Sequence, residues 1–425
     1  ISRGGEPRGC WLLMLALLTP VVAVAEPAPT WSEAELLAVL RSETAEADKA
    51  LACKFLAVNG SATAVGDLAP LLANPRLASW ARIALEAIPG EEASATLRDA
   101  AGSMQGRLRV GAITSLGVRR DQAAVPLLAG LLAAEDAEVA AASAWSLGQI
   151  ATVEAGELLA AAIAAGSSPD RLDAMARAAV LCAGNLAAAG QAEGAIALFG
   201  VVRAAEVSDQ RRAEAIRGTI LAKGQAGIPL LVETLRAPQK RLANMAIFTA
   251  RDVGRGDPAV AAAVDAALVK ELEAAAAARA DERAVILIDV LAGRNAGGAG
   301  STLATVFAGL AADGTQSAVR LAAIKALGRV GDAATTGILL SVLIDDDQRL
   351  AAAAQDALAA LPGEAVDREI VGRLADADTR SLAAIVELIG GRRIPAVAEV
   401  LPLATHADAR VRTAAISALG PTVDL

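Results

Sequence analysis

Large aromatic side chains are nearly absent from this sequence of 425 residues. Tyr does not occur, and aromatic residues make up only 2% of the chain although 55% of its residues are hydrophobic. A single core of this size normally buries many aromatic rings, and the length itself exceeds the usual size of one compact core. Ala, Leu and Val dominate the apolar residues. The composition therefore favours many thin contacts between helices over one thick core.

Histidine is also scarce, which excludes several kinds of catalytic or metal site. His406 is the single histidine, so a two-histidine metal site cannot form, and any Ser-His-Asp triad would have to use this residue. The sequence has no Gly-x-Ser-x-Gly motif around its serines, no Cys-x-x-Cys-His run for haem, and no phosphate-binding Gly-Lys-Ser/Thr motif. We expect His406 to be an exposed turn residue. The sequence predicts no catalytic, cofactor-binding or metal-binding residue.

The first 25 residues have the pattern of a secretory signal peptide. Arg3 and Arg8 precede an apolar run from Trp11 to Ala25, which ends in the small-x-small motif Ala23-Val24-Ala25. This run is short for a membrane span. We therefore predict a signal peptide at residues 1–25, a location in the periplasm or outside the cell, and no stable membrane insertion.

Acidic residues outnumber basic ones. Removal of Arg3, Glu6 and Arg8 with the signal peptide leaves 37 basic and 47 acidic side chains, a net charge of −10. Such a surface repels phosphate backbones, so nucleic acid is a poor candidate partner. The two remaining cysteines, Cys53 and Cys182, lie about four repeats apart in the scheme below, too far for a disulfide at roughly 8–10 Å per helix layer. We expect two buried free thiols.

A repeat of about 31 residues runs through the chain. One leucine per repeat marks it, and we call this residue the anchor. The anchors near the two ends are spaced 29, 31 and 31 residues apart in one group and 31, 30 and 31 in the other; they are Leu56, Leu85, Leu116 and Leu147, and then Leu327, Leu358, Leu388 and Leu419. A small residue stands four positions before every anchor, as close helix packing requires. This pattern predicts an α-solenoid.

Other signals define the repeat unit. Acidic residues at helix-start positions, such as Asp136, Asp347 and Asp408, predict N-caps, and so does Asn74 before Pro75. The glycines that follow the anchors, such as Gly117 and Gly328, suit helix ends. A second amphipathic segment lies between successive copies, so we predict an all-α solenoid of about twelve antiparallel helix pairs over residues 26–425. In its middle the anchors are Leu186, Leu221, Val253 and Leu291, and residues 292–301 form a possible flexible joint.

The repeated segments resemble the repeats of the HEAT-repeat family, in particular the short bacterial repeats of phycobilisome-lyase subunits. The stretches 318–332 and 409–420 carry the family's Val-Arg, paired alanines and Ala-Leu-Gly. The chain also resembles exported HEAT proteins of environmental bacteria, which are often joined to a haem-carrying or hydrolase-like domain. The resemblance implies a fold, and its motif encodes packing instead of chemistry.

Several residues could serve either structure or function. The acidic runs 344–348 and 374–380 could bind calcium, but they stand where N-caps belong. The pairs Arg119-Arg120, Arg211-Arg212 and Arg392-Arg393 are most simply solvated turns. The recurrent arginines are expected to form a polar ladder between neighbouring repeats; these are Arg109, Arg320 and Arg412.

The remaining candidates for a binding surface are Trp31, Trp80 and Trp145, because aromatic residues are so scarce. Trp145 takes the place of Thr114 and Lys325 in other repeats, so it should face outward at least in part. It could anchor an interface or simply fill an uneven groove. Trp31 should cap the first helix pair.

The sequence thus predicts an exported, non-catalytic scaffold that binds a protein of unknown identity along a curved, extended surface. An alternative is the docking arm of a larger exported enzyme with a catalytic or haem domain elsewhere in its chain. A bilin-handling lyase and a HEAT-like DNA glycosylase are weaker hypotheses, because export disfavours the first and the negative charge disfavours the second.

The signal peptide can be tested by the mass of the exported protein. We expect a mature chain that begins at Glu26, because signal peptidase cleaves after small-x-small motifs. Intact-mass and N-terminal peptide analysis of the secreted fraction would measure this. An exported chain that retains residues 1–25 would contradict the prediction.

Overall fold

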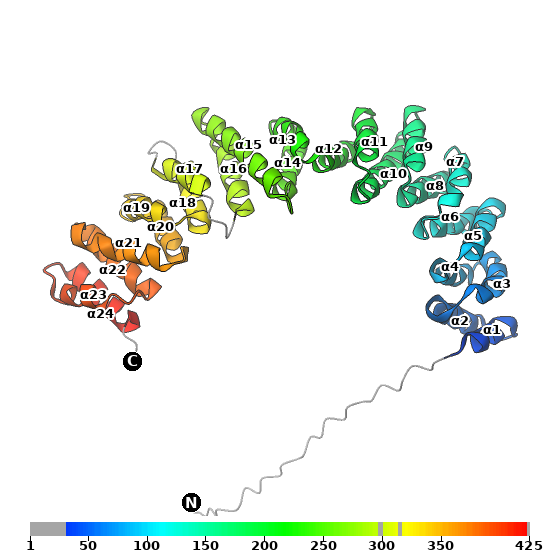
Figure 1. Cartoon of the computed structure of the whole chain (residues 1–425), viewed down its shortest axis with the longest axis horizontal. Coiled ribbons are helices and arrows are strands. Elements are labelled where there is room, and N and C mark those ends of the chain that lie inside the picture. Colours follow the sequence, from blue (N-terminus) through cyan, green and yellow to red (C-terminus); the bar gives the residue numbers. More distant parts are fainter. Residues whose placement is uncertain (1–30, 296–300, 313–316, 423–425) are drawn as a thin grey trace, which may run out of the picture. The chain divides into compact units, whose positions relative to one another are not determined.

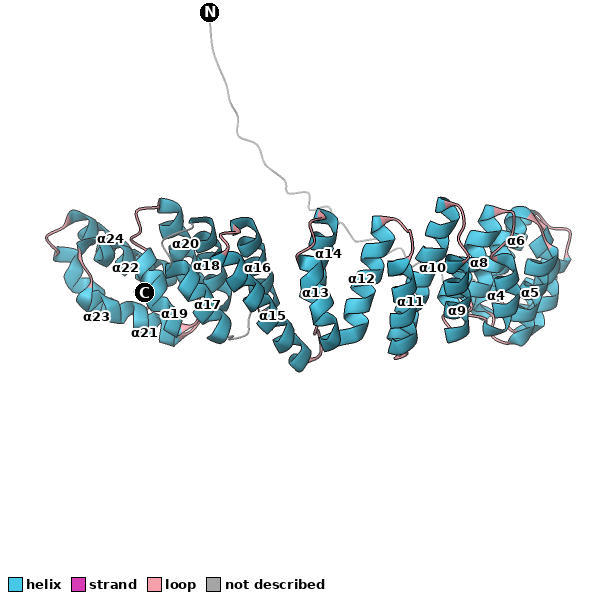
Figure 2. Cartoon of the chain, turned by 90° about the horizontal axis from the view of Figure 1, so that it is seen from above, coloured by secondary structure: helices cyan, strands magenta, loops and turns pink. Residues whose placement is uncertain are grey.

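The computed structural model describes residues 31–295, 301–312 and 317–422. Over these residues every regular element is an α- or 3₁₀-helix, and no strand occurs (Figure 2). The predicted signal peptide, 1–25, lies outside the described residues, as do residues 296–300 of the predicted joint. The joint stays a prediction for residues 296–300, whereas residues 292–294, predicted as part of it, form the end of the helix α16 (Asp281–Arg294).

The helices follow one another in pairs, labelled in chain order in Figure 1. The first six pairs are α1 (Glu33–Arg41) with α2 (Glu46–Asn59), α3 (Val65–Leu68) with α4 (Ala78–Ala87), α5 (Glu91–Ser103) with α6 (Gly106–Val118), α7 (Val125–Leu131) with α8 (Ala137–Ile150), α9 (Val153–Ala164) with α10 (Pro169–Ala188), and α11 (Ala192–Ala204) with α12 (Asp209–Lys223). The next six are α13 (Ile228–Leu235) with α14 (Lys240–Asp252), α15 (Pro258–Ala277) with α16 (Asp281–Arg294), α17 (Ser301–Ala312) with α18 (Ser317–Val330), α19 (Ala333–Val342) with α20 (Gln348–Ala360), α21 (Glu364–Gly372) with α22 (Thr379–Arg392), and α23 (Val397–Val400) with α24 (Ala409–Thr422). The predicted α-solenoid of about twelve pairs is confirmed.

The described chain divides into two compact units, one ending at Ser115 and one beginning at Leu116. Within each unit the even-numbered helices pack side by side in one layer, as α2 does on α4 and α18 on α20. The odd-numbered helices cover one side of that layer. Among the described residues no helix covers the opposite side of the even-numbered helices, and we call this side the even-helix face.

The anchors form the core of both units. Leu56, Leu85, Leu147, Leu327 and Leu358 are fully buried. The small residues four positions earlier are buried in all but one of the eight end repeats, Ala384 being the half-buried exception. Each turn of an even-numbered helix therefore places one large and one small side chain against its neighbours, which lets thin layers interdigitate.

The repeat register slips in the middle of the chain. Leu221, predicted as an anchor, is 39% exposed, while Thr219 and Ile220 are buried. The prediction of an inward Leu221 was wrong. A buried Thr219, whose hydroxyl donates to the Ala215 carbonyl (2.8 Å), takes the inward place that a leucine has elsewhere.

The glycines after the anchors do not end helices, contrary to the sequence prediction. Gly117 and Gly328 lie inside α6 and α18, and a Cβ atom on Gly328 would lie 2.9 Å from Cα of Ala357 on α20. The same holds for Gly117, where it would meet Cα of Ser146 at 2.8 Å. The glycines are there because the next even-numbered helix approaches too closely for any side chain.

The predicted acidic N-caps are confirmed. Asp136 accepts from the backbone N–H of Glu138 (2.9 Å), Asp347 from that of Arg349 (3.0 Å), and Asp408 from that of Arg410 (2.8 Å). These bonds fix where α8, α20 and α24 begin. The prediction that Asn74 caps a helix beginning at Pro75 was wrong, because α4 begins only at Ala78, without a side-chain cap. Asn74 instead follows a 3₁₀-helix, and its side chain accepts from the Arg76 N–H in the turn (2.9 Å).

Both described cysteines are buried free thiols, as expected. Burial raises the pKa of Cys53 to about 11 and that of Cys182 to about 12. A thiol with such a pKa is almost fully protonated at neutral pH and is therefore a poor nucleophile or metal ligand.

A matched pair of glycine substitutions tests the close approach of the even-numbered helices. We expect Gly328→Ala to destabilise the fold by about 1–3 kcal/mol, because the new methyl group collides with the backbone of Ala357. The control is Gly309→Ala on α17, where a Cβ meets nothing within 4 Å, and a gain of about 0.5–1 kcal/mol is expected from helix propensity. Urea unfolding followed by circular dichroism measures both, and equal effects would refute the packing role.

The cysteines provide a second test of the core. In the native protein we expect Cys53 and Cys182 to resist iodoacetamide at pH 7, because at a pKa of about 11 only roughly one Cys53 thiol in ten thousand is ionised. Both should react in urea. Peptide mass spectrometry separates the cysteines, and rapid native modification of either one would show that its burial is wrong.

Candidate functional site

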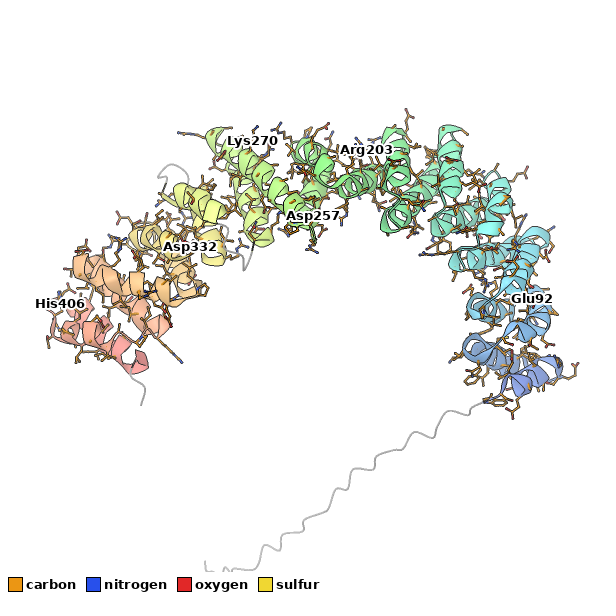
Figure 3. All side chains as sticks on the ribbon, in the orientation of Figure 1. Glu92, Arg203, Asp257, Lys270, Asp332 and His406 are labelled. Atoms are coloured by element: carbon orange, nitrogen blue, oxygen red, sulfur yellow. The ribbon has the colours of Figure 1, made fainter. Side chains whose placement is uncertain are left out.

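His406 helps to shape the turn before α24 (Figure 3). Its Nδ1 accepts from the backbone N–H of Asp408 (3.1 Å), and its carbonyl accepts from Nη1 of Arg412 (2.8 Å). We predicted an exposed side chain, but the side chain of His406 is half-buried. Both contacts are made with residues at the start of α24, so His406 stabilises the beginning of that helix.

The acidic runs lie at the starts of helices, where their carboxylates accept hydrogen bonds from backbone N–H groups. The backbone N–H of Asp347 donates to Asp345 (2.9 Å) and holds the pKa of that carboxyl below its usual value. The Ser381 N–H, at 2.8 Å, does the same for Asp378. Within the described residues no three His, Cys, Asp or Glu side chains gather as a metal site requires. The geometry favours the capping interpretation over calcium binding.

The recurrent arginines mostly close helix ends and do not form the predicted ladder. Arg109 donates from Nε to the Ala101 carbonyl near the end of α5 (2.9 Å), and Arg320 does the same to Ala311 in α17 (2.9 Å). Only Arg320 also reaches the next repeat, where its Nη2 lies 2.9 Å from Asp345. The expectation was incomplete because the carbonyl groups left unpaired at a helix end are nearer than the next repeat.

Two buried arginines link consecutive repeats. Arg392 is only 8% exposed and pairs with Asp367 (2.5 Å) while donating to the Leu361 carbonyl (2.7 Å). Arg294, 5% exposed, pairs in the same way with Asp265 (2.5 Å) and donates to the Val253 carbonyl. The reading of Arg392 as a solvated turn was wrong. Its guanidinium closes the end of the preceding even-numbered helix.

Large apolar side chains lie exposed on the even-numbered helices α2 and α4 of the first unit. We call these residues the apolar patch: Leu51 (46% exposed) and Val58 (81%) on α2, with Trp80 (39%) and Ile83 (46%) on α4. Leu51 and Trp80 both stand five residues before their anchors, where other repeats carry Gly111, Ala142 and Ala322. Each of these side chains is too exposed to count as a core residue.

Sequence reasoning found only part of this patch. It singled out Trp80 because tryptophan is scarce, and it missed Leu51. The available signal was a large residue at a repeat position that is otherwise small. Trp145 is half-buried on α8, in agreement with the expectation that it faces outward in part.

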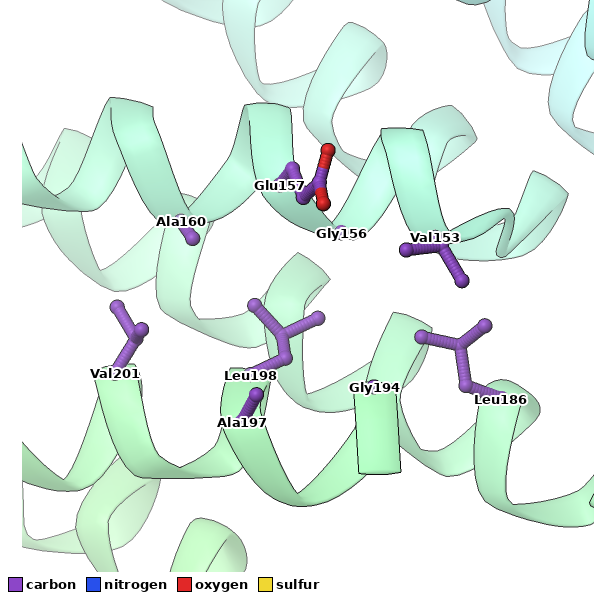
Figure 4. A pocket seen from close by; sticks show the side chains of 9 residues that line it. All are labelled: Val153, Gly156, Glu157, Ala160, Leu186, Gly194, Ala197, Leu198 and Val201. Atoms are coloured by element: carbon purple, nitrogen blue, oxygen red, sulfur yellow. The ribbon is translucent and has the colours of Figure 1, made fainter. Parts of the chain in front are cut away.

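Two apolar grooves accompany these surfaces. One, of about 280 Å³, lies between α1 and α2 and is lined by Trp31, Leu51 and Phe55 among others. Another, of about 140 Å³, lies between α9 and α11, where Gly156, Gly194 and Leu198 line it (Figure 4). Neither has converging polar groups of the kind that a catalytic site needs.

Comparison with known proteins identifies the repeats in one segment. Residues 97–180, from α5 into α10, match the family model described as HEAT repeats. The predicted resemblance is therefore confirmed for this segment, whereas the relation to phycobilisome-lyase subunits stays a prediction. No curated protein matches the chain. In the part of the chain that is described, no helix has the length and apolar character that a membrane span needs.

Solved structures also resemble the chain. A chain in a homology model of the full-length AP-3 complex in an intermediate open conformation is 11% identical, with a TM-score of 0.42, covering 92% of this chain and 82% of its own. A chain from a study of the interaction between cadherin and beta-catenin is 13% identical, with a TM-score of 0.34, covering 92% and 99%. The described chain is an α-solenoid, and its residues 97–180 are similar to HEAT repeats.

Proposed function

We propose that this protein is an exported, non-catalytic scaffold that binds another protein through its even-helix face. One observation carries the proposal, namely the apolar patch on α2 and α4. Trp80 and Ile83 are 39% and 46% exposed there, and Leu51 and Val58 extend the patch onto the neighbouring helix. Clustered exposed apolar side chains mark interaction sites.

The chemistry of the patch suits a protein partner. Tryptophan is enriched in interface hot spots, and the aliphatic side chains around it can exclude water from such a contact. Complete burial of one such side chain contributes about 1.5–3 kcal/mol, so the four residues together can supply the core of a stable interface. The helices below them are held by the buried anchors Leu56 and Leu85, which makes the surface rigid before binding.

The use of the polar residues supports a scaffold. The side chains that resemble catalytic or metal groups in the sequence take part in caps and ion pairs, as Asp347 and Arg392 do. HEAT repeats in residues 97–180 add to the proposal, because helical repeats expose one extended face for recognition. Export is part of the proposal and rests on the predicted signal peptide, 1–25.

Site-specific photo-crosslinking tests the scaffold function. With a photoreactive amino acid in place of Trp80 or Ile83, we expect crosslinks to the same partner protein in the exported fraction of the source cells. The control position is Glu92, exposed at the start of α5 (Figure 3), which should give none. Crosslinks that are equally frequent at Glu92, or absent from positions 80 and 83, would contradict the proposal.

A further inference from the structure

In the second unit, the even-helix face of α14, α16 and α18 combines an aromatic ring with cations. Phe248 on α14 is 61% exposed, and it stands five residues before its anchor, like Leu51 and Trp80. The guanidinium carbon of Arg251 lies 5.8 Å from the centre of its ring. This cation–π contact holds the arginine on the surface.

One carboxylate connects this arginine to the neighbouring helices. Asp289 on α16 lies 2.9 Å from Nη2 of Arg251 and 3.2 Å from Nη2 of Arg329 on α18. All three side chains are between 41% and 54% exposed. Two guanidinium groups thus share a single carboxylate, which leaves one positive charge uncompensated.

An apolar groove of about 410 Å³ opens beside these charges, between α16 and α18. Val285 and Ile288 of α16 and Leu321 of α18 supply its apolar lining. It exists because α18 carries the small residues Ala318 and Ala322, which leave room between the two helices. The groove can hold one or two large apolar side chains of a ligand.

Cations and one carboxylate stand at the rim of the groove. Asp289, Lys325 and Arg329 line it together with the apolar residues. Lys325 is exposed one helical turn before Arg329 and has no ion-pair partner in the described ranges. The next even-numbered helix, α20, carries Asp356 at the matching position, so the cationic surface ends at α18. It is a local excess of positive charge on a chain of net charge −9.

We infer that this groove binds an acidic amphipathic segment of a partner protein. An aliphatic or aromatic side chain of the segment enters the space above Ala318 and Ala322, and its flanking carboxylates meet Lys325 and Arg329. The inference rests on the proposed function in taking the even-helix face as the binding face, but it concerns a surface separate from the apolar patch.

The observations favour an acidic peptide over a nucleic acid. Only three cations cluster here, whereas duplex binding requires a longer row of phosphate contacts to overcome the repulsion of an acidic chain. The groove lining is aliphatic and complements a side chain such as Leu or Ile. Helix-in-groove recognition uses this combination of apolar anchors and flanking charges.

Peptide binding to the full mature chain tests the inference. The probe is a fluorescein-labelled helical peptide of about eighteen residues, with Leu on one face and Glu beside it. Fluorescence anisotropy should show saturable binding that weakens at high salt, as expected for exposed ion pairs. A peptide with Ser in place of Leu, at the same charge, should bind at least about tenfold more weakly.

Matched variants locate the site. We expect Lys325→Glu to weaken binding about tenfold, whereas Lys270→Glu, the same charge change on the exposed side of α15 (Figure 3), should change it less than about twofold. Ala318→Phe fills the groove without altering charge and should also weaken binding about tenfold. Circular dichroism of each variant confirms that the fold is retained.

Several outcomes would overturn the inference. The inference would be wrong if the acidic peptide did not bind. It would also be wrong if Lys270→Glu and Lys325→Glu weakened binding equally, or if the Leu and Ser peptides bound with equal affinity. Either of these two results would show only general electrostatic attraction between the peptide and the chain. Stronger binding of a single-stranded oligonucleotide at the same site would point to a different partner class. None of these results depends on crosslinks from Trp80, so failure here and failure of the proposed scaffold remain distinguishable.

Discussion

The close approach of one even-numbered helix to the next is the constraint on which this structure depends. Glycines such as Gly328 face the backbone of the following helix with no room for a Cβ atom. Alanines such as Ala323, which stand four residues before the anchors, keep the distance between the two helices short along the rest of the contact. Helices that pack so closely cannot hold aromatic rings between them, which explains why only 2% of the residues are aromatic.

The same constraint determines where large side chains can be useful. Trp80 and Phe248 are excluded from the thin contacts and lie at the surface of the even-numbered helices, 39% and 61% exposed. Charged residues such as Asp136, Asp408 and Arg392 complete helix ends, where backbone N–H and C=O groups would otherwise be unpaired. In this solenoid such polar residues complete the structure, whereas the large side chains that the close contacts exclude remain on the surface.

The sequence alone predicted those structural features that depend on nearby residues and recur in each repeat. The period, the small residue before each anchor and the acidic N-caps depend on contacts within one or two turns of a helix, so their pattern recurs and can be read. The roles of Gly328 and Arg392 could not be predicted, because they depend on the distance to the next repeat. Leu221 was misplaced where the register slips, and Phe248 was overlooked in the same irregular part of the chain.

The buried arginines also bear on how such a chain can evolve. Arg392, on α22, is satisfied by a carboxylate of α21 and by carbonyl groups at the end of α20. Loss of the repeat that contains α20 would leave the ion pair with Asp367 in place but remove these carbonyl acceptors, and a buried donor left without a partner costs about 1–3 kcal/mol. Arg294 connects α14 to α16 in the same way. Duplication or deletion is therefore tolerated most easily in blocks that keep each arginine with the repeat before it, so the array lengthens or shortens by several repeats at once.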